Sequence, residues 1–84
     1  MPEDLVGTVI HFFKGPSVAM VQLTAGELVV GDRLHFHGHT TDFTATITSM
    51  QVNHQPVEQA QAGVEVAIQV GDRARPKDQV FKVS

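Results

Sequence analysis

The chain has no cysteine and no long apolar run, and both absences narrow the kinds of protein it can be. Without cysteine it can form neither a disulfide scaffold nor a thiolate metal site. No stretch approaches the roughly 20 apolar residues that a membrane-spanning helix needs. The first residues, MPEDLVGT, are acidic and lack the basic start and apolar run of a signal peptide. The sequence therefore predicts a soluble, cytoplasmic protein.

Motifs of two common enzyme classes are also missing. No G-x-x-x-x-G-K-[ST] phosphate loop is present, so we expect no binding of GTP through such a loop. Ser17, Ser49 and Ser84 lack the G-x-S-x-G context of a nucleophile. A chain of 84 residues also offers little room for a cleft that tunes a catalytic acid or base. We therefore expect no enzymatic activity and no cofactor.

Basic residues are fewer than acidic ones, six against nine, which gives a net charge of −3 with histidine neutral. A stand-alone nucleic-acid-binding protein usually carries a basic excess. The charge therefore argues against strong non-specific binding to nucleic acid, but it leaves room for a contact through a local basic patch.

What the chain does contain is a series of short segments rich in β-branched and aromatic residues, separated by turn residues. In RLHFH, Leu34 and Phe36 fall on one face of a strand, and Arg33, His35 and His37 fall on the other. We expect the first pair to point into the core. The predicted strands cover residues 5–13, 18–24, 33–37, 43–53, 64–70 and 79–84, with a further short apolar run at 28–30.

Two details of the second half modify this pattern. The alternation within 43–53 slips by one residue near Ser49 and Met50, which a β-bulge would produce. The segment HQPVEQAQAG carries a weak helical signal, and we expect one helical turn from Val57 to Ala60, ended by Gly63. About six short strands without a real helix predict an all-β domain over residues 1–84. We favour a small closed or nearly closed six-stranded, largely antiparallel barrel, because closure hides the edges of the sheet.

The spacing of several residues resembles the second domain of translational GTPases, the β-barrel of the elongation factor Tu and initiation factor type. The first half carries V-G-x-V followed by G-x-L-x-V-G-D-x-I-x-I-x-G, and the second half carries P-V-x-x-A-x-x-G between two strands. The matching positions are Val6, Gly7, Val9, Gly26, Leu28, Val30, Gly31, Asp32, Leu34, Phe36, Gly38, Ile47, Met50, Pro56, Val57, Ala60, Gly63, Val66 and Ile68.

Gly31 and Asp32 suit a tight turn in which the aspartate accepts a backbone N–H and the glycine is left-handed. Lys77 and Asp78 stand where the family usually has Gly-Asp, which predicts a less strained turn. The resemblance implies a non-catalytic accessory module, without a GTPase domain, that contacts RNA or a ribosome-associated protein.

By the same resemblance, the RNA-contacting regions are the first turn and the basic link near the C-terminus. Four cations there could contact phosphate, and either Phe12 or Phe13 could stack on a base. The alternative is a solvated loop, since Asp72 and Asp78 interrupt the basic run. The four candidate residues are Lys14, Arg73, Arg75 and Lys77.

His35, His37 and His39 recur at every second residue and are weak candidates for metal ligands, with either His39 or Asp42 as the third ligand beside His35 and His37. An outward strand face offers no dry shell around a metal. The favoured interpretation is therefore a polar outer face without a metal. Another class also stays open: a protein-docking module unrelated to translation, for which an exposed apolar patch would be the mark.

Overall fold

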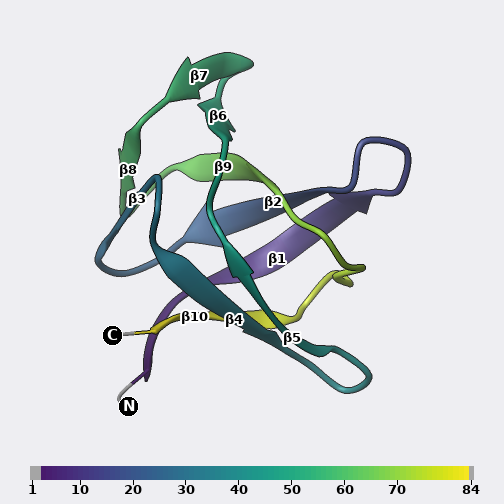
Figure 1. Ribbon diagram of the computed structural model, residues 1–84. Coiled ribbons are helices and arrows are strands. Elements are labelled where there is room, and N and C mark those ends of the chain that lie inside the picture. Colours follow the sequence, from purple (N-terminus) through teal and green to yellow (C-terminus); the bar gives the residue numbers. More distant parts are fainter. Residues whose placement is uncertain (1–2, 84) are drawn as a thin grey trace.

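Ten strands and no helix make up residues 3–83, the part of the chain that the computed structural model describes (Figure 1). The prediction of an all-β domain is confirmed. No helix in this part is available to span a membrane. The strands are β1 (Glu3–Phe13), β2 (Val18–Leu23), β3 (Glu27–Val29), β4 (Arg33–His37), β5 (Asp42–Thr46), β6 (Met50–Val52), β7 (Gln55–Val57), β8 (Gln59–Gln61), β9 (Glu65–Gln69) and β10 (Gln79–Val83).

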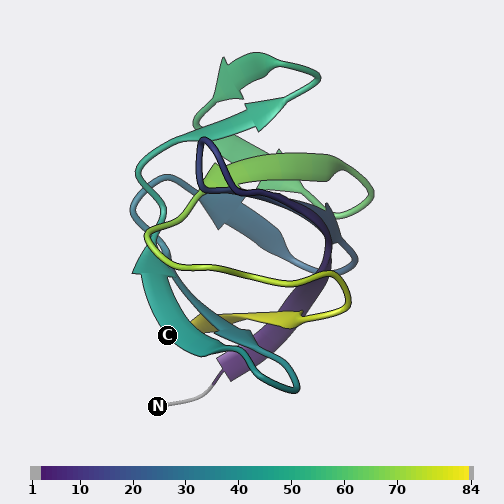
Figure 2. The ribbon, with the colours of Figure 1, turned by 90° about the vertical axis from the view of Figure 1, so that its right-hand side faces the viewer.

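Eight of these strands form one antiparallel sheet in the order β5-β4-β10-β1-β2-β9-β6-β7, and β3 pairs with β8 in a small second sheet. The large sheet curls around the core (Figure 2). Within residues 3–83, no pairing joins its outer strands β5 and β7. The prediction of a closed or nearly closed six-stranded barrel is therefore wrong in its strand number and in full closure, because the large sheet has eight strands and its outer strands are not paired.

The extra strands come from two segments that the sequence pattern assigned differently. Residues 43–53 form two strands, because β5 pairs with β4 whereas β6 pairs with β9. Between them, the N–H of Ile47 donates to the carbonyl of Asp32 at 2.8 Å, and the carbonyl of Ser49 accepts from Gln69. The slip in the alternation therefore marks a change of partner strand rather than a bulge. Bulges do occur in β1, near Gly7 and between Val9 and His11.

The predicted helical turn from Val57 to Ala60 is also wrong. Val57 belongs to β7 and lies opposite Met50, while Ala60 belongs to β8 and lies opposite Leu28. Pairing with two different strands gives the backbone groups partners that a single helical turn would leave unsatisfied. Both side chains still contact the core, which explains why their spacing looked helical.

The core is a single cluster of apolar side chains inside the curled sheet. Leu34 and Phe36 are fully buried in it, whereas His35 and His37 point outward, as the alternation predicted. Phe36 stacks on Phe43 of the neighbouring strand with ring centroids 4.8 Å apart. The buried members are Val6, Val9, Ala19, Val21, Leu23, Leu28, Leu34, Phe36, Ile47, Met50, Ala60, Val66, Ile68, Val70, Ala74 and Val80.

The turns at Gly31-Asp32 and Lys77-Asp78 can be compared with the predictions made for them. Gly31 is left-handed, with φ 102°, and the carboxylate of Asp32 accepts the N–H of Val29 at 2.9 Å, so the prediction for this turn is confirmed. Lys77 has φ 78°, a conformation that favours glycine. The prediction of a less strained turn before Asp78 is therefore wrong.

Candidate functional site

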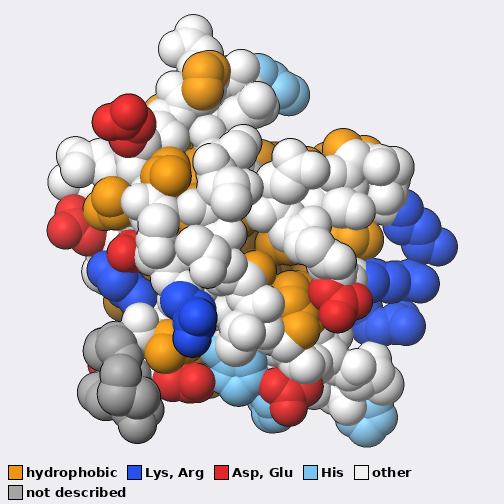
Figure 3. Space-filling model, in the orientation of Figure 1, with side chains coloured by type: hydrophobic (Ala, Val, Ile, Leu, Met, Phe, Trp, Pro, Cys, Tyr) orange, Lys and Arg blue, Asp and Glu red, His pale blue; other side chains and the backbone are white. Residues whose placement is uncertain are grey.

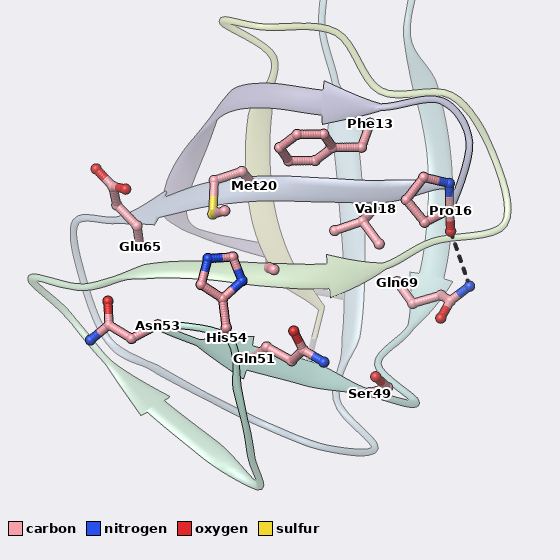
Figure 4. Close-up of a pocket in the computed structure, with 11 residues that line it drawn as sticks. Phe13, Pro16, Val18, Met20, Ser49, Gln51, Asn53, His54, Glu65 and Gln69 are labelled. Carbon is pink, nitrogen blue, oxygen red and sulfur yellow. Dashed lines mark hydrogen bonds between the residues drawn. The ribbon is translucent and has the colours of Figure 1, made fainter.

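An open groove of about 610 Å³ lies over the outward faces of β2, β9 and β6 (Figure 4). The turn between β1 and β2 borders one end, and the turn between β6 and β7 borders the side. The lining residues are Phe13, Pro16, Val18, Met20, Ser49, Gln51, Asn53, His54, Glu65, Ala67 and Gln69.

The strand registers place these side chains in rows across the sheet. Met20 lies opposite Ala67, which in turn lies opposite Gln51, so one row crosses β2, β9 and β6. A second row joins Phe13 and Val18, and it continues to Gln69. Successive residues of a strand point to opposite faces, and the alternate residues Ala19, Val21, Val66 and Ile68 are buried in the core. The groove is therefore the outer face of the same strands that build the core.

The groove combines an apolar floor with amide groups at its margin. Phe13 is 43% exposed, a large fraction for a phenylalanine, and Val18 and Met20 are half-buried. Gln51 and Asn53 are exposed, so a ligand can reach their donors and acceptors. The amide of Gln69 donates to the carbonyl of Pro16 at 3.2 Å and ties β9 to the β1–β2 turn. Such a surface can bury apolar groups while it hydrogen-bonds to peptide-like groups.

His54 borders the groove in an unusual backbone conformation. Asn53 and His54 form the loop between the paired residues Val52 and Gln55, with φ 53° and 63°. Consecutive left-handed residues are typical of a tight hairpin turn of type I′, in which glycine is preferred at the second position. Figure 4 shows the His54 ring between Gln51 and Met20, in front of β9. A strained histidine whose ring reaches a groove is a candidate for ligand contact.

The four basic residues predicted as a binding site are all exposed. Lys14 belongs to the β1–β2 turn, and the other three belong to the link between β9 and β10. The link begins beside this turn, since the N–H of Val70 donates to the carbonyl of Ser17 at 2.9 Å, and it ends against β1, where the backbone N–H of Lys77 donates to the carbonyl of Val9 at 2.7 Å. Figure 3 shows Lys and Arg side chains gathered at this end of the molecule. We call Lys14, Arg73, Arg75 and Lys77 the basic end.

The two aspartates of the link are turned toward the backbone. Asp78 is only 4% exposed, and its carboxylate accepts the N–H of Arg75 at 2.8 Å. The carboxylate of Asp72 accepts the N–H of Arg73 at 2.8 Å. Within residues 3–83, none of the four cations of the basic end forms an ion pair. Contact of this end with RNA stays a prediction.

The histidine face has a different arrangement from a row of metal ligands. Nδ1 of His35 lies 2.9 Å from Oε1 of Glu3, and Nε2 lies 2.5 Å from Oδ1 of Asp42. Hydrogen bonding to Glu3 and then to Asp42 raises the pKa of His35 above its ordinary 6.5, although desolvation opposes the shift. The hydrogen bond from His35 lowers the pKa of Asp42.

These contacts occupy both ring nitrogens of His35, while His37 and His39 are exposed. A metal ion would have to displace a carboxylate from a ring nitrogen to bind His35. In the part of the chain that the structure describes, no group of three or more histidine, cysteine or acidic side chains is arranged to hold a metal.

The sequence singled out the four residues of the basic end, whose role in binding stays a prediction, but it did not show the groove. The only signal in the sequence was the outward position of Val18, Met20 and Ala67 on strands whose alternate residues fill the core. The strands β2, β9 and β6 are not consecutive in the chain, so the row that crosses them depends on registers that a single sequence does not show.

Comparison with known proteins finds similar segments in proteins named as a protease and collagenases. The chain is 35% identical over 77 residues to an uncharacterized protease of Methanocaldococcus jannaschii, covering 90% of this chain and 19% of that protein. It is 31% identical over 81 residues to a collagenase of Porphyromonas gingivalis, covering 95% of this chain and 22% of the relative. The chain thus spans about a fifth of the length of these curated relatives. No protein-family model matches it.

The fold matches solved structures over nearly the whole chain. The C-terminal domain of a protein described as a U32 peptidase, from Geobacillus thermoleovorans, superposes with a TM-score of 0.87 and 20% identity, covering 96% of this chain and 93% of that one. Its selenomethionine variant gives 0.84, with 92% and 96% coverage. The chain therefore has the fold of this C-terminal domain.

These findings overturn the expected relationship with translation factors. The related sequences are named as a protease and collagenases, and the structural match is to a domain of a U32 peptidase. The prediction of a translation-factor accessory module is therefore wrong. The motifs behind it, such as the Gly31-Asp32 turn and the bulge at Gly7, meet backbone requirements of a small curled sheet. Such requirements recur in proteins of different function.

Proposed function

We propose that this chain is a non-catalytic accessory domain of a peptidase-type protein, and that its outer groove binds an extended polypeptide. The observation that carries the proposal is the groove itself, with an apolar floor at Val18 and Met20 and exposed amides at Gln51 and Asn53. The names of the related proteins support a polypeptide as the ligand class, since a protease and collagenases act on polypeptides.

The groove has the form that an extended chain requires. A polypeptide in β or polyproline conformation rises by about 3.1–3.4 Å per residue and presents a carbonyl and an N–H at each step. Side-chain amides can donate to such carbonyls and accept from such N–H groups. The apolar floor can take the side chains that point into the groove. The molecule is 30 Å across, so about nine extended residues would span it.

The groove is better suited to binding than to peptide hydrolysis. Ser49, His54 and Glu65 line it, but within residues 3–83 no hydrogen bond joins them. A catalytic nucleophile needs a base in contact with it, which a third group orients. The groove is also open, so it would not exclude water from a reaction intermediate. These features support a non-catalytic role, with hydrolysis assigned to other parts of the related proteins.

Fluorescence anisotropy tests the proposal with capped, uncharged peptides of about ten residues that contain valine, threonine, proline and glutamine. We expect a Kd of the order of 10–100 μM, or about 5.5–6.8 kcal/mol of binding free energy. Phe13→Ala and Met20→Gln each weaken binding about tenfold, since both remove apolar contact from the floor. Ile10→Ala is the matched control, because Ile10 is 41% exposed on the same strand as Phe13 but lies outside the groove.

Circular dichroism confirms that each variant is folded. The proposal fails when no peptide binds at millimolar protein concentration, or when Ile10→Ala weakens binding as much as the groove variants do. The cytoplasmic location predicted from the sequence belongs to the same proposal, and fractionation of the native cells tests it.

A further inference from the structure

Charge is distributed unequally between the two ends of the groove. Pro16 and Gln69 lie at the end beside the β1–β2 turn, and Glu65 and Asn53 lie at the other end (Figure 4). Gln69 is four positions after Glu65 along β9, which corresponds to about 13 Å. The first end adjoins the basic end of the molecule, whereas the second carries the exposed carboxylate of Glu65.

The basic end is physically continuous with the groove. Lys14 stands between Phe13 and Pro16, which both line the groove. The link that carries Arg73 and Arg75 begins where Val70 donates to the carbonyl of Ser17 in the same turn. A chain that leaves the groove past Pro16 therefore passes directly to the cations of the basic end.

These cations are available to a ligand. All four are exposed, and within residues 3–83 none is neutralised by an ion pair. The carboxylate of Asp78 is buried against the N–H of Arg75, so it does not face the solvent side of the link. Four cations against the two aspartates of the link leave this end positive in a chain whose net charge is −3.

From this asymmetry we propose that the groove selects polypeptides that carry acidic residues immediately beyond one end of the bound segment. The inference rests on the proposed function. It adds which end of the groove recognises the flanking residues and the charge that these residues carry. Acidic side chains past Pro16 meet Lys14 and the arginines of the link. Acidic residues at the other end lie near the carboxylate of Glu65 and do not increase the affinity of the peptide. Charge complementarity of this kind contributes mainly to specificity and to the rate of association.

Three peptides with the same uncharged centre test the inference: one without a flank, one with aspartates at its N-terminal end and one with them at its C-terminal end. We expect only one flanked peptide to bind more tightly than the unflanked one, by about fivefold to tenfold at low salt. Since exposed charges are screened within about 10 Å at 0.1 M salt, most of this gain should disappear at high salt.

The double charge reversal Lys14→Glu with Arg75→Glu removes the gain and leaves binding of the unflanked peptide unchanged. Arg33→Glu is the matched control, since Arg33 is an exposed cation on β4, outside the groove and the basic end, and the gain survives in it. Equal gains for both flanks overturn the inference, as does a gain that persists in the double variant. In these cases the unflanked peptide still binds, so the proposed function stands.

Loss of all peptide binding defeats both proposals together. A single-stranded RNA oligonucleotide provides the remaining comparison. Binding of the oligonucleotide at the basic end, without any effect of the acidic flank on peptide affinity, overturns the inference and assigns this end to nucleic acid instead.

Discussion

Nδ1 of His35 lies 2.9 Å from Oε1 of Glu3, although 32 positions separate the two residues in the chain. Because Nε2 of the same ring contacts Asp42, the histidine joins the beginning of β1 to the beginning of β5 across the sheet. The ring also lies beside Phe81 of β10 and His37 of its own strand. A doubly protonated ring donates to both carboxylates, so the arrangement favours the charged form of His35.

The stability of the fold should therefore depend on pH through His35. Its pKa is raised in the folded state, so its contribution is complete below the ordinary value of 6.5 and is lost as pH rises through the folded pKa. The pKa of Asp42 is lowered, so its contribution is present above its ordinary 3.8 and is lost at lower pH. We expect His35→Gln to destabilise the protein more at about pH 5.5 than at about pH 8.5.

Urea unfolding of the wild type and the variant at both pH values measures this difference. His39→Gln is the control, because His39 is exposed in the turn before β5 and makes no described contact with a carboxylate. Equal effects of His35→Gln at the two pH values would show that the ring acts only through packing.

Gly38 should tolerate no side chain, because the β4–β5 turn packs against Asp78. A Cβ at Gly38 would lie 1.9 Å from Oδ1 and 2.7 Å from Cγ of Asp78. The aspartate cannot move freely, since its other oxygen accepts the N–H of Arg75. We expect Gly38→Ala to lower the free energy of unfolding by about 1–3 kcal/mol. Gly15→Ala, where nothing lies within 4 Å of an added Cβ, should change it by less than about 0.5 kcal/mol. Thermal unfolding of both variants decides the matter.

The contrast between Leu34 and Val57 shows how far the sequence predicts this fold. Alternation in RLHFH depends on one strand with one buried face, so it correctly places Leu34 and Phe36 in the core and His35 outside. The segment around Val57 and Ala60 is different, because its two strands have three residues each and pair with different partners, β7 with the adjacent β6 and β8 with the distant β3. Three residues are too few for a period to distinguish helix from strand.

The same limit applies to the functional surfaces. The residues of the basic end could be singled out from the sequence because three of the four are nearly consecutive and none has an apolar role, and their function stays a prediction. The groove could not, because Met20, Ala67 and Gln51 come from three strands and meet only through their register. The strain at Lys77 was missed because its left-handed conformation, with φ 78°, runs against the preference of a non-glycine residue, and no glycine marks this turn in the sequence.

The carboxylate of Asp32 should stabilise the turn between β3 and β4 mainly as a hydrogen-bond acceptor. It accepts the N–H of Val29 at 2.9 Å, and Nζ of Lys82 lies 3.3 Å from the same oxygen. We expect Asp32→Ala to cost about 1 kcal/mol, and Asp32→Asn to cost less because its side chain keeps an acceptor. Lys82→Ala should cost little, since exposed ion pairs contribute about 0–1 kcal/mol. Urea unfolding would contradict this order if Lys82→Ala were the most damaging change.

His54 should lower the stability of the fold while it contributes to peptide binding. A left-handed conformation costs a non-glycine residue about 1–2 kcal/mol, a cost that glycine avoids. Part of this gain is lost, because glycine gives up more conformational entropy on folding. We therefore expect His54→Gly to raise the free energy of unfolding by about 0.5–1 kcal/mol. It should also weaken peptide binding several-fold, because it removes a ring that borders the groove. Ser17→Gly is the matched control, since Ser17 has φ 56° but does not line the groove. It should gain similar stability without loss of binding. Unchanged peptide affinity in His54→Gly would remove His54 from the binding surface.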